Sequence, residues 1–189
     1  MKSYLSIIIF FFLFSCQHSS PEINEVEFTI DKSLLSDSSF VSGSGFSITP
    51  PKNWKRTETY NHELQKSLFL HINNKLLAIY KSDSTNCAMI ISEPPDTDFD
   101  RIKGYVNEID KKQYPDSIWL DVQTSVFNYN TFNIIQIVFQ NAQLLVFKLF
   151  FQQLPGIIEL DFIIPRSEIQ NNNIQSVESS IGSVKHVKN

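Results

Sequence analysis

The stretch from Thr131 to Ile164 constrains this chain more than any other, because it holds three consecutive apolar runs of strand length. These runs are rich in Ile, Val and Phe, which favour strands, and they cover residues 131–139, 144–151 and 157–164. The break at residues 154–156 reads Leu-Pro-Gly, in which proline presets φ and glycine accepts a positive φ. The sequence therefore predicts an antiparallel β-meander.

Alternate residues of a strand point to opposite faces of a sheet. Grouped by residue number, one set holds Phe132, Ile134, Val138, Leu144, Val146, Phe150, Ile158, Leu160, Phe162 and Ile164. The other set holds Ile135, Ile137, Phe139, Leu145, Phe147, Leu149, Phe151, Ile157 and Ile163. Both faces are apolar and both must be covered, so we expect an α+β fold with an antiparallel sheet between helices (an α/β/α sandwich).

Two amphipathic helices are predicted as these covers. The first has Thr97 as its N-cap and Asp100 three residues later, the spacing of a capping box. Its apolar stripe is Phe99, Ile102, Val106 and Ile109. The second starts at Ser167, with Gln170 at the capping-box position, and its stripe is Ile174, Val177, Ile181 and Val184. Earlier in the chain, residues 76–80 and 87–92 are predicted strands around a polar turn, and residues 68–72 form either a strand or a short helix.

The N-terminal residues have the pattern of an export signal. Lys2 is followed by an apolar core from Leu5 to Phe14, whose length suits a signal peptide and is too short for a spanning helix of about 20 residues. The core ends in Leu13-Phe14-Ser15-Cys16, which resembles the lipobox of bacterial lipoproteins. That resemblance implies diacylglycerol transfer to Cys16, cleavage after Ser15, and acylation of the new amino terminus, for example by palmitate.

Two other interpretations of this leader remain open: an ordinary secretory signal with a coincidental cysteine, or a buried N-terminal helix. If Cys16 carries lipid, Cys87 is the other cysteine of the chain and no intramolecular disulfide can form. Residues 1–15 are thus the predicted signal peptide, and residues 16–44 the lipidated N-terminus and a serine-rich flexible tether. Within the tether, the alternation of residues 22–30 leaves a strand open.

The start of the predicted domain reads Gly45-Phe46-Ser47-Ile48-Thr49-Pro50-Pro51-Lys52-Asn53-Trp54. This short alternating strand, followed by two prolines and a tryptophan, resembles the opening of the PsbP/Mog1-like family. The family includes an extrinsic photosystem protein, a Ran-binding nuclear protein and many bacterial lipoproteins. The resemblance covers about residues 45–185 and implies a single domain over 45–189, with a scaffold or partner-binding role. No residues match the Ran-binding or photosystem motifs. We expect Trp54 to fill the core, with a ligand contact as the alternative.

Composition and motifs exclude several kinds of site. Lys and Arg number 16 against 20 Asp and Glu, with no basic run, so nucleic acid is not an expected partner. The acids at 96–100 begin like a calcium loop, but Arg101 stands where glycine is needed and Asn107 where glutamate is needed. None of the four histidines (His18, His62, His71 and His186) has ligand spacing to another, so no metal site and no cofactor is expected.

Catalytic residues are not predicted. Cys87 lies in an apolar strand, where burial raises a thiol pKa and makes the group inert. Glu159 and Asp161 share one side of the last apolar run and could act as an acid and base pair. Exposure at a strand end or at a sheet edge explains these acids equally well. We therefore expect that the protein is not an enzyme.

These observations lead to one main functional hypothesis and two alternatives. We expect a monomeric, lipid-anchored bacterial cell-envelope protein, held to the membrane through Cys16, with a non-catalytic domain that binds an envelope protein partner. In a Gram-negative cell the anchor would lie in the outer membrane, with the domain on the periplasmic or the surface side. The first alternative is a carrier of a lipid or apolar small molecule in a cavity between sheet and helix. The second is an envelope hydrolase.

Overall fold

The computed structural model describes residues 24–58, 74–95, 97–104, 121–153 and 156–187. The predicted signal peptide, Cys16, residues 68–72 and the helical positions Val106 and Ile109 lie outside these ranges. The predictions made for them stay predictions. Within the described ranges, no helix combines the length and the apolar character that crossing a membrane requires.

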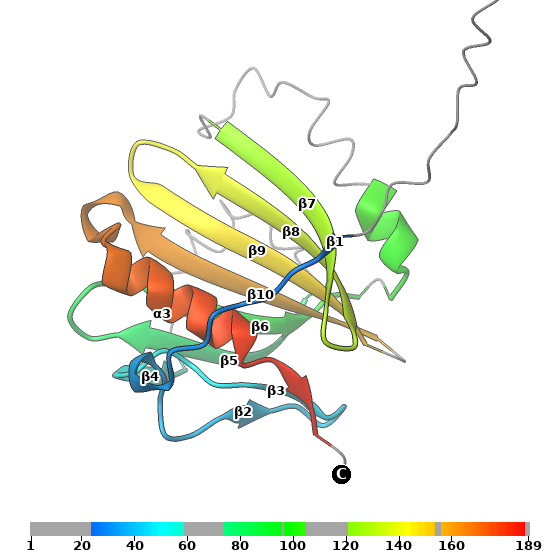
Figure 1. Cartoon of the computed structure of the whole chain (residues 1–189), viewed down its shortest axis with the longest axis horizontal. Helices are drawn as coiled ribbons and strands as arrows, with labels where there is room; N and C mark the ends of the chain where they lie inside the picture. The colour runs from blue at the N-terminus through cyan, green and yellow to red at the C-terminus, as the bar shows by residue number, and fades with distance from the viewer. Residues whose placement is uncertain (1–23, 59–73, 96, 105–120, 154–155, 188–189) are drawn as a thin grey trace, which may run out of the picture.

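An eight-stranded sheet forms the body of the fold, in the order β1-β7-β8-β9-β10-β6-β5-β4 (Figure 1). All neighbours are antiparallel except β1 and β7, which run parallel. The strands are β1 Asn24–Glu25, β4 Trp54–Thr57, β5 Lys75–Ser82, β6 Ala88–Glu93, β7 Asp121–Tyr129, β8 Phe132–Gln140, β9 Leu144–Gln153 and β10 Gly156–Pro165. The predicted meander is confirmed as β8, β9 and β10, and the two earlier strands as β5 and β6.

A second, three-stranded sheet has the order β11-β3-β2. Its strands are β2 Phe40–Val41, β3 Phe46–Ile48 and β11 Lys185–His186. Gly45, just before β3, has a φ of 83°, and a Cβ at this position would lie 2.6 Å from the carbonyl oxygen of Val187. This turn therefore requires glycine.

The register of the meander differs from the grouping by residue number. Ile134 of β8 pairs with Phe151 of β9, and Phe151 pairs with Ile158 of β10. Each turn thus brings an even-numbered residue opposite an odd-numbered one. Odd-numbered residues of β9 share a face with even-numbered residues of β8 and β10, so the predicted grouping is wrong for β9.

Two buried apolar clusters lie on the opposite faces of the meander, so the prediction that both faces are apolar is confirmed. The first core cluster includes, from the meander, Phe132, Ile134, Leu149, Phe151, Ile158, Leu160, Phe162 and Ile164. The second core cluster includes Ile135, Ile137, Phe139, Val146, Phe150, Ile157 and Ile163.

The first core cluster is covered by more than a helix. Helix α3 (Asn171–Gly182) contributes Val177 and Ile181, and Val184 follows just after it. The small sheet adds Phe40, Phe46 and Ile48 to the same cluster. Helix α3 begins later than predicted, because Ser167 lies in the separate 3₁₀ turn η2 (Arg166–Glu168) and Gln170 is the N-cap.

The second core cluster receives Phe99 and Ile102 from a helix that covers residues 99–104 within the described range. Its N-cap is Asp98 and not Thr97. The Asp98 Oδ1 accepts hydrogen bonds from the backbone N–H groups of Asp100 (3.1 Å) and Arg101 (3.3 Å). A carboxylate can satisfy two of the free amide groups at a helix start, which explains this choice. The further extent of this cover stays a prediction.

Residues 24–44 are not a free tether, although the sequence predicts one there. The chain after β1 runs alongside α3 (Figure 1), and Val26 and Phe28 pack against the first core cluster. The Asp31 backbone N–H donates to Ser179 Oγ at 3.1 Å, just before the 3₁₀ turn η1 (Lys32–Leu34). We call residues 24–31 the N-terminal strap. Within the described residues, the packed part of the chain therefore includes a segment ahead of Gly45, where the sequence placed the start of the domain.

Candidate functional site

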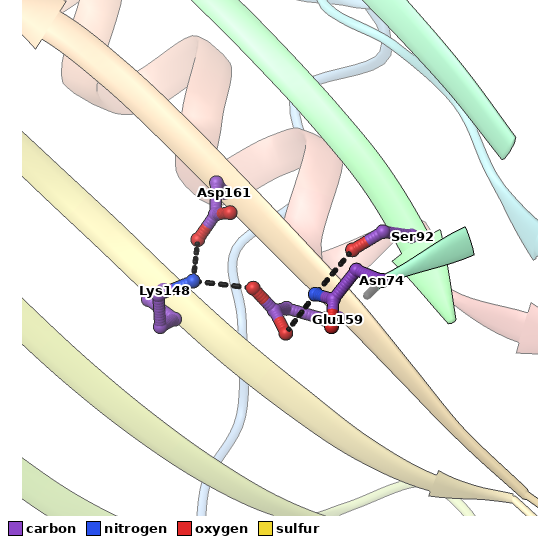
Figure 2. Close-up of polar contacts among 5 residues, drawn as sticks. All are labelled: Asn74, Ser92, Lys148, Glu159 and Asp161. Atoms are coloured by element: carbon purple, nitrogen blue, oxygen red, sulfur yellow. Dashed lines mark hydrogen bonds and ion pairs between the residues drawn. The ribbon is translucent and has the colours of Figure 1, made fainter. Parts of the chain in front are cut away.

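Three charged side chains are buried together in the middle of the sheet. They are Lys148 of β9 and Glu159 and Asp161 of β10, with exposed fractions of 3%, 1% and 0% (Figure 2). We call these three residues the ionic cluster. Buried charges are rare in proteins unless they are paired, so this group is the most unusual chemical feature of the described chain.

The strand register brings the ionic cluster together. Asp161 is the direct cross-strand partner of Lys148, and Glu159 lies two residues along β10 on the same face. That face is the one of the second core cluster, whose member Phe150 follows Lys148 by two residues. The Lys148 Nζ lies 5.7 Å from the centroid of the Phe150 ring, within range of a cation–π contact.

Direct contacts link the three side chains and extend to the next strand. Lys148 Nζ lies 2.7 Å from Asp161 Oδ1 and donates a hydrogen bond to Glu159 Oε1. The other Glu159 oxygen, Oε2, accepts from Asn74 Nδ2 at 2.8 Å, and Asn74 also donates to Ser92 Oγ at 3.2 Å (Figure 2). The Asp161 Oδ2 accepts no hydrogen bond within the described ranges. Both oxygens of Glu159 therefore accept hydrogen bonds, whereas Oδ2 of Asp161 accepts none within the described ranges.

The charges of this cluster do not balance when all three groups are ionised, because one ammonium faces two carboxylates. Burial raises the pKa of Asp161 to about 7; Lys148 opposes this shift and Glu159 adds to it. Burial works against the charge of Lys148, but Asp161 and Glu159 outweigh it and hold the pKa of Lys148 above its usual value. Just below pH 7 the two carboxyl groups therefore hold one proton between them, so that the ammonium faces a single negative charge.

The cluster can hold a proton, but its surroundings are those of a core. A general acid or base must come within hydrogen-bond distance of the group it serves, and these carboxyl groups have almost no exposed surface. The exposed-edge explanation for Glu159 and Asp161 is wrong, because β10 lies between β9 and β6 in the interior of the sheet. The arrangement stabilises one register of β9 against β10, since a slip would leave charges buried without partners.

Lys148 is the member of the cluster that sequence reasoning missed. It interrupts the apolar run 144–151, while two acids interrupt the run 157–164. Opposite charges inside neighbouring apolar strands are the signal that would have predicted the pair, since each charge needs a partner once buried.

The other singled-out residues have structural positions. Trp54 belongs to the first core cluster, with its ring 6.5 Å from that of Phe162, so the expected core role is confirmed. Cys87 is fully buried just before β6, and burial raises the pKa of its thiol. The ring of His186 stacks on Phe132, with centroids 4.3 Å apart. Cys16, His18, His62 and His71 lie outside the described residues, which contain no group of three side chains placed to hold a metal ion.

A pocket of about 250 Å³ lies at the turn end of the β9–β10 hairpin, and none of the three residues of the ionic cluster lines it. It is lined by residues of these two strands, of the loop after β6 and of the turn before β3. None of its lining residues was singled out as a site from the sequence, apart from Thr97 as a predicted helix cap.

No family model matches this sequence, and no curated protein matches it. Among solved structures, the chain is similar to the solution structure of cyanobacterial PsbP (CyanoP) from Synechocystis sp. PCC 6803. The TM-score is 0.46 at 10% identity, over 79% of this chain and 92% of that one. It is also similar to a Bacteroides thetaiotaomicron VPI-5482 crystal structure at 1.50 Å resolution, with a TM-score of 0.43 and 14% identity. That match covers 79% of this chain and 48% of the other, so this chain spans about half of it.

These comparisons concern the arrangement of the strands. The described residues form mostly antiparallel sheets with few helices, which agrees with the α+β class that the sequence predicted. At these identities and TM-scores, no residue role, partner or activity passes from either structure to this chain.

Proposed function

We propose that this protein is a lipid-anchored bacterial cell-envelope protein whose PsbP-like domain binds an envelope protein partner and carries out no catalysis. The lipid on Cys16 would hold the chain at the membrane, and the N-terminal strap would join the anchored end to the domain. We also propose that the helix starting at residue 99 continues across the second core cluster, which would complete a cover on both faces.

The burial of the ionic cluster is the observation that best supports a non-catalytic domain. Glu159 and Asp161 are the acid and base pair suggested by the sequence, and Lys148 forms ion pairs with both in the interior of the sheet. Their side chains have almost no exposed surface that a substrate could reach. This position favours a structural role for these groups over hydrolysis.

The anchor rests on the sequence Leu13-Phe14-Ser15-Cys16 and on the cysteine count. Cys87 is buried and free within the described residues, and therefore offers no exposed thiol for a bridge. This fits a chain in which the other cysteine is used by a lipid and not by a disulfide. Several acyl chains would give a durable anchor, at about 0.8 kcal/mol for each buried methylene.

The carrier alternative receives less support. It expects an apolar cavity between sheet and helix, but Val177 and Ile181 of α3 are buried directly against the first core cluster. The pocket described above lies at a hairpin end, and its volume of about 250 Å³ is below the roughly 300–1,000 Å³ of usual ligand sites.

The anchor is tested by metabolic labelling with an alkyne fatty acid in a Gram-negative host. We expect the wild type to take up label and to fractionate with membranes. Cys16→Ala should lose both properties, and Cys87→Ala should keep both as the matched control. Equal labelling of wild type and Cys16→Ala would contradict the anchor.

Partner binding is tested separately, by photo-crosslinking on intact envelopes followed by mass spectrometry. We expect a defined protein adduct that forms with wild type and is reduced in Cys16→Ala, where the domain is no longer held at the membrane. A crosslink to extractable lipid alone would favour the carrier instead.

A further inference from the structure

The pocket at the hairpin end, which we call the end pocket, is a continuation of the first core cluster. Three of its lining residues, Gln153 of β9, Ile158 of β10 and Glu93 of β6, lie on neighbouring strands. Gln153 and Glu93 follow Phe151 and Ile91 of the first core cluster by two residues, and Ile158 belongs to that cluster itself. Because alternate strand residues share a face, the apolar rows of the core end in this pocket.

Gln153 gives the end pocket an unusual polar group. Its side chain is only 3% exposed, and its Nε2 donates to the backbone oxygen of Ser44 in the turn before β3. Its Oε1 is buried and accepts no hydrogen bond within the described residues. A buried acceptor without a partner is costly, and a small turn of the Gln153 side chain toward the pocket would let this oxygen accept a hydrogen bond from a ligand.

Glu93 adds negative charge to the same pocket. Its side chain is 32% exposed, and its Oε2 accepts from Lys75 Nζ at 2.9 Å. An ion pair with a lysine as exposed as this one contributes little, so a cationic ligand can compete for the carboxylate. The pocket is completed by apolar contacts from Ile158 and Pro94.

We propose that the end pocket binds a small organic ammonium compound. Its N–H donors would meet Gln153 Oε1 and the Glu93 carboxylate, and its hydrocarbon part would lie against Ile158 and Pro94. A pocket of about 250 Å³ restricts the ligand to a size below that of usual drug-like molecules. The proposal is independent of the lipid anchor and of the protein partner, because it uses neither Cys16 nor an outer surface of the domain.

The test is an NMR titration of the ¹⁵N-labelled full chain in detergent micelles. Three probes share a butyl chain and differ only in their head group: n-butylammonium, n-butanol and n-pentanoate. We expect n-butylammonium to give a saturable shift of the Gln153 side-chain amide, with the tightest binding of the three. The missing amide signal in Gln153→Met identifies the resonance.

Variants then separate the two contacts. Gln153→Met should weaken n-butylammonium binding about tenfold, the effect of about 1.4 kcal/mol. Gln152→Met is the matched control, because Gln152 points to the other side of β9, where it accepts from Asn133 Nδ2. Glu93→Gln, at a partly exposed site that tolerates change, should reduce the preference for n-butylammonium over n-butanol about tenfold.

Three results would overturn the proposal: no saturable shift with n-butylammonium, equal affinity for the three probes, or unchanged affinity in folded Glu93→Gln. Folding of each variant is read from the unchanged dispersion of the other amide signals. Should Gln153→Met lose that dispersion, Glu93→Gln and the probe comparison still decide the outcome.

Discussion

Lys148 and Asp161 face each other across β9 and β10, with the ammonium nitrogen 2.7 Å from a carboxylate oxygen and both side chains removed from water. Each of these charges depends on the other, since an ion that loses its partner in a protein interior keeps its desolvation cost. The first two predictions follow from this pairing.

Replacement of Lys148 by methionine should destabilise the fold strongly. The change keeps the side-chain length but leaves Glu159 and Asp161 buried together without a cation, which costs about 3–5 kcal/mol in comparable buried pairs. The free energy of unfolding, measured by urea denaturation at pH 8, gives the loss directly. Lys55→Met is the control, because Lys55 pairs with Asp83 on an exposed strand, and this variant should lose far less. Similar losses in the two variants would contradict the prediction.

Stability should fall as the pH rises toward neutrality. Burial raises the pKa of Asp161 from 3.8 to about 7, so the folded state holds a proton that the unfolded state has released. The free energy of unfolding therefore decreases between about pH 4 and pH 7, with a slope of up to about 1.4 kcal/mol per pH unit from this group. The raised pKa of Lys148 changes the free energy of unfolding only at pH values near or above 10.5, so it has no effect between pH 4 and pH 7.

Asp161→Asn should remove much of that slope, because asparagine does not titrate. Denaturation curves at several pH values between 4 and 8 measure it, with Asp83→Asn as the exposed control. An identical slope in wild type and Asp161→Asn would show that the proton is held elsewhere.

Loss of the observed helix cap should be measurable in isolation. Asp98→Ala removes the acceptor of two backbone N–H groups and should cost about 1 kcal/mol, whereas Thr97→Ala should cost little. Chemical denaturation of both variants decides between the two candidate caps. A larger loss for Thr97→Ala would favour the cap that the sequence spacing predicted.

Cys87 should be unreactive in the folded protein. Its thiol is fully buried and burial raises its pKa, so few thiolates form and reagents cannot reach them. We expect Ellman's reagent to label no thiol of the folded wild type and one thiol after denaturation, because the proposed lipid would block Cys16. Rapid labelling before unfolding would show that Cys87 is accessible, and two thiols after unfolding would show that Cys16 is free.

The dense apolar runs made the meander predictable, because segments such as residues 157–164 leave few alternatives to a buried strand. β7 was harder to predict, since Gln123, Thr124 and Ser125 interrupt its apolar pattern and an edge position next to a two-residue strand tolerates them. A local sequence signal of the β7–β8 hairpin is Asn130 in its turn, because asparagine accepts the positive φ, here 52°, that tight hairpin turns require.

The site was predictable only in part. Sequence spacing placed Glu159 and Asp161 on one side of a strand, but it could not say which neighbouring strand would face them. That choice depends on the register of the meander strands, which the turns between them set. The turn between β9 and β10 decides the position of Lys148, because a loop longer or shorter by one residue would place Lys148 on the opposite face from the acids. Burial of polar groups likewise depends on distant elements, as Gln153 and its contact with Ser44 illustrate.

The N-terminal strap determines where a mechanical load would enter this domain. Tension on the chain before Asn24 would first pull on the short β1–β7 pairing, then on Phe28 against Tyr129, and then on the bond from Asp31 to Ser179. The long strands of the meander would carry the load only after these contacts have broken. Peeling of the strap would therefore remove β1 and expose one side of α3 while the longer strands stay paired, so the N-terminal end of the described chain would yield before the core.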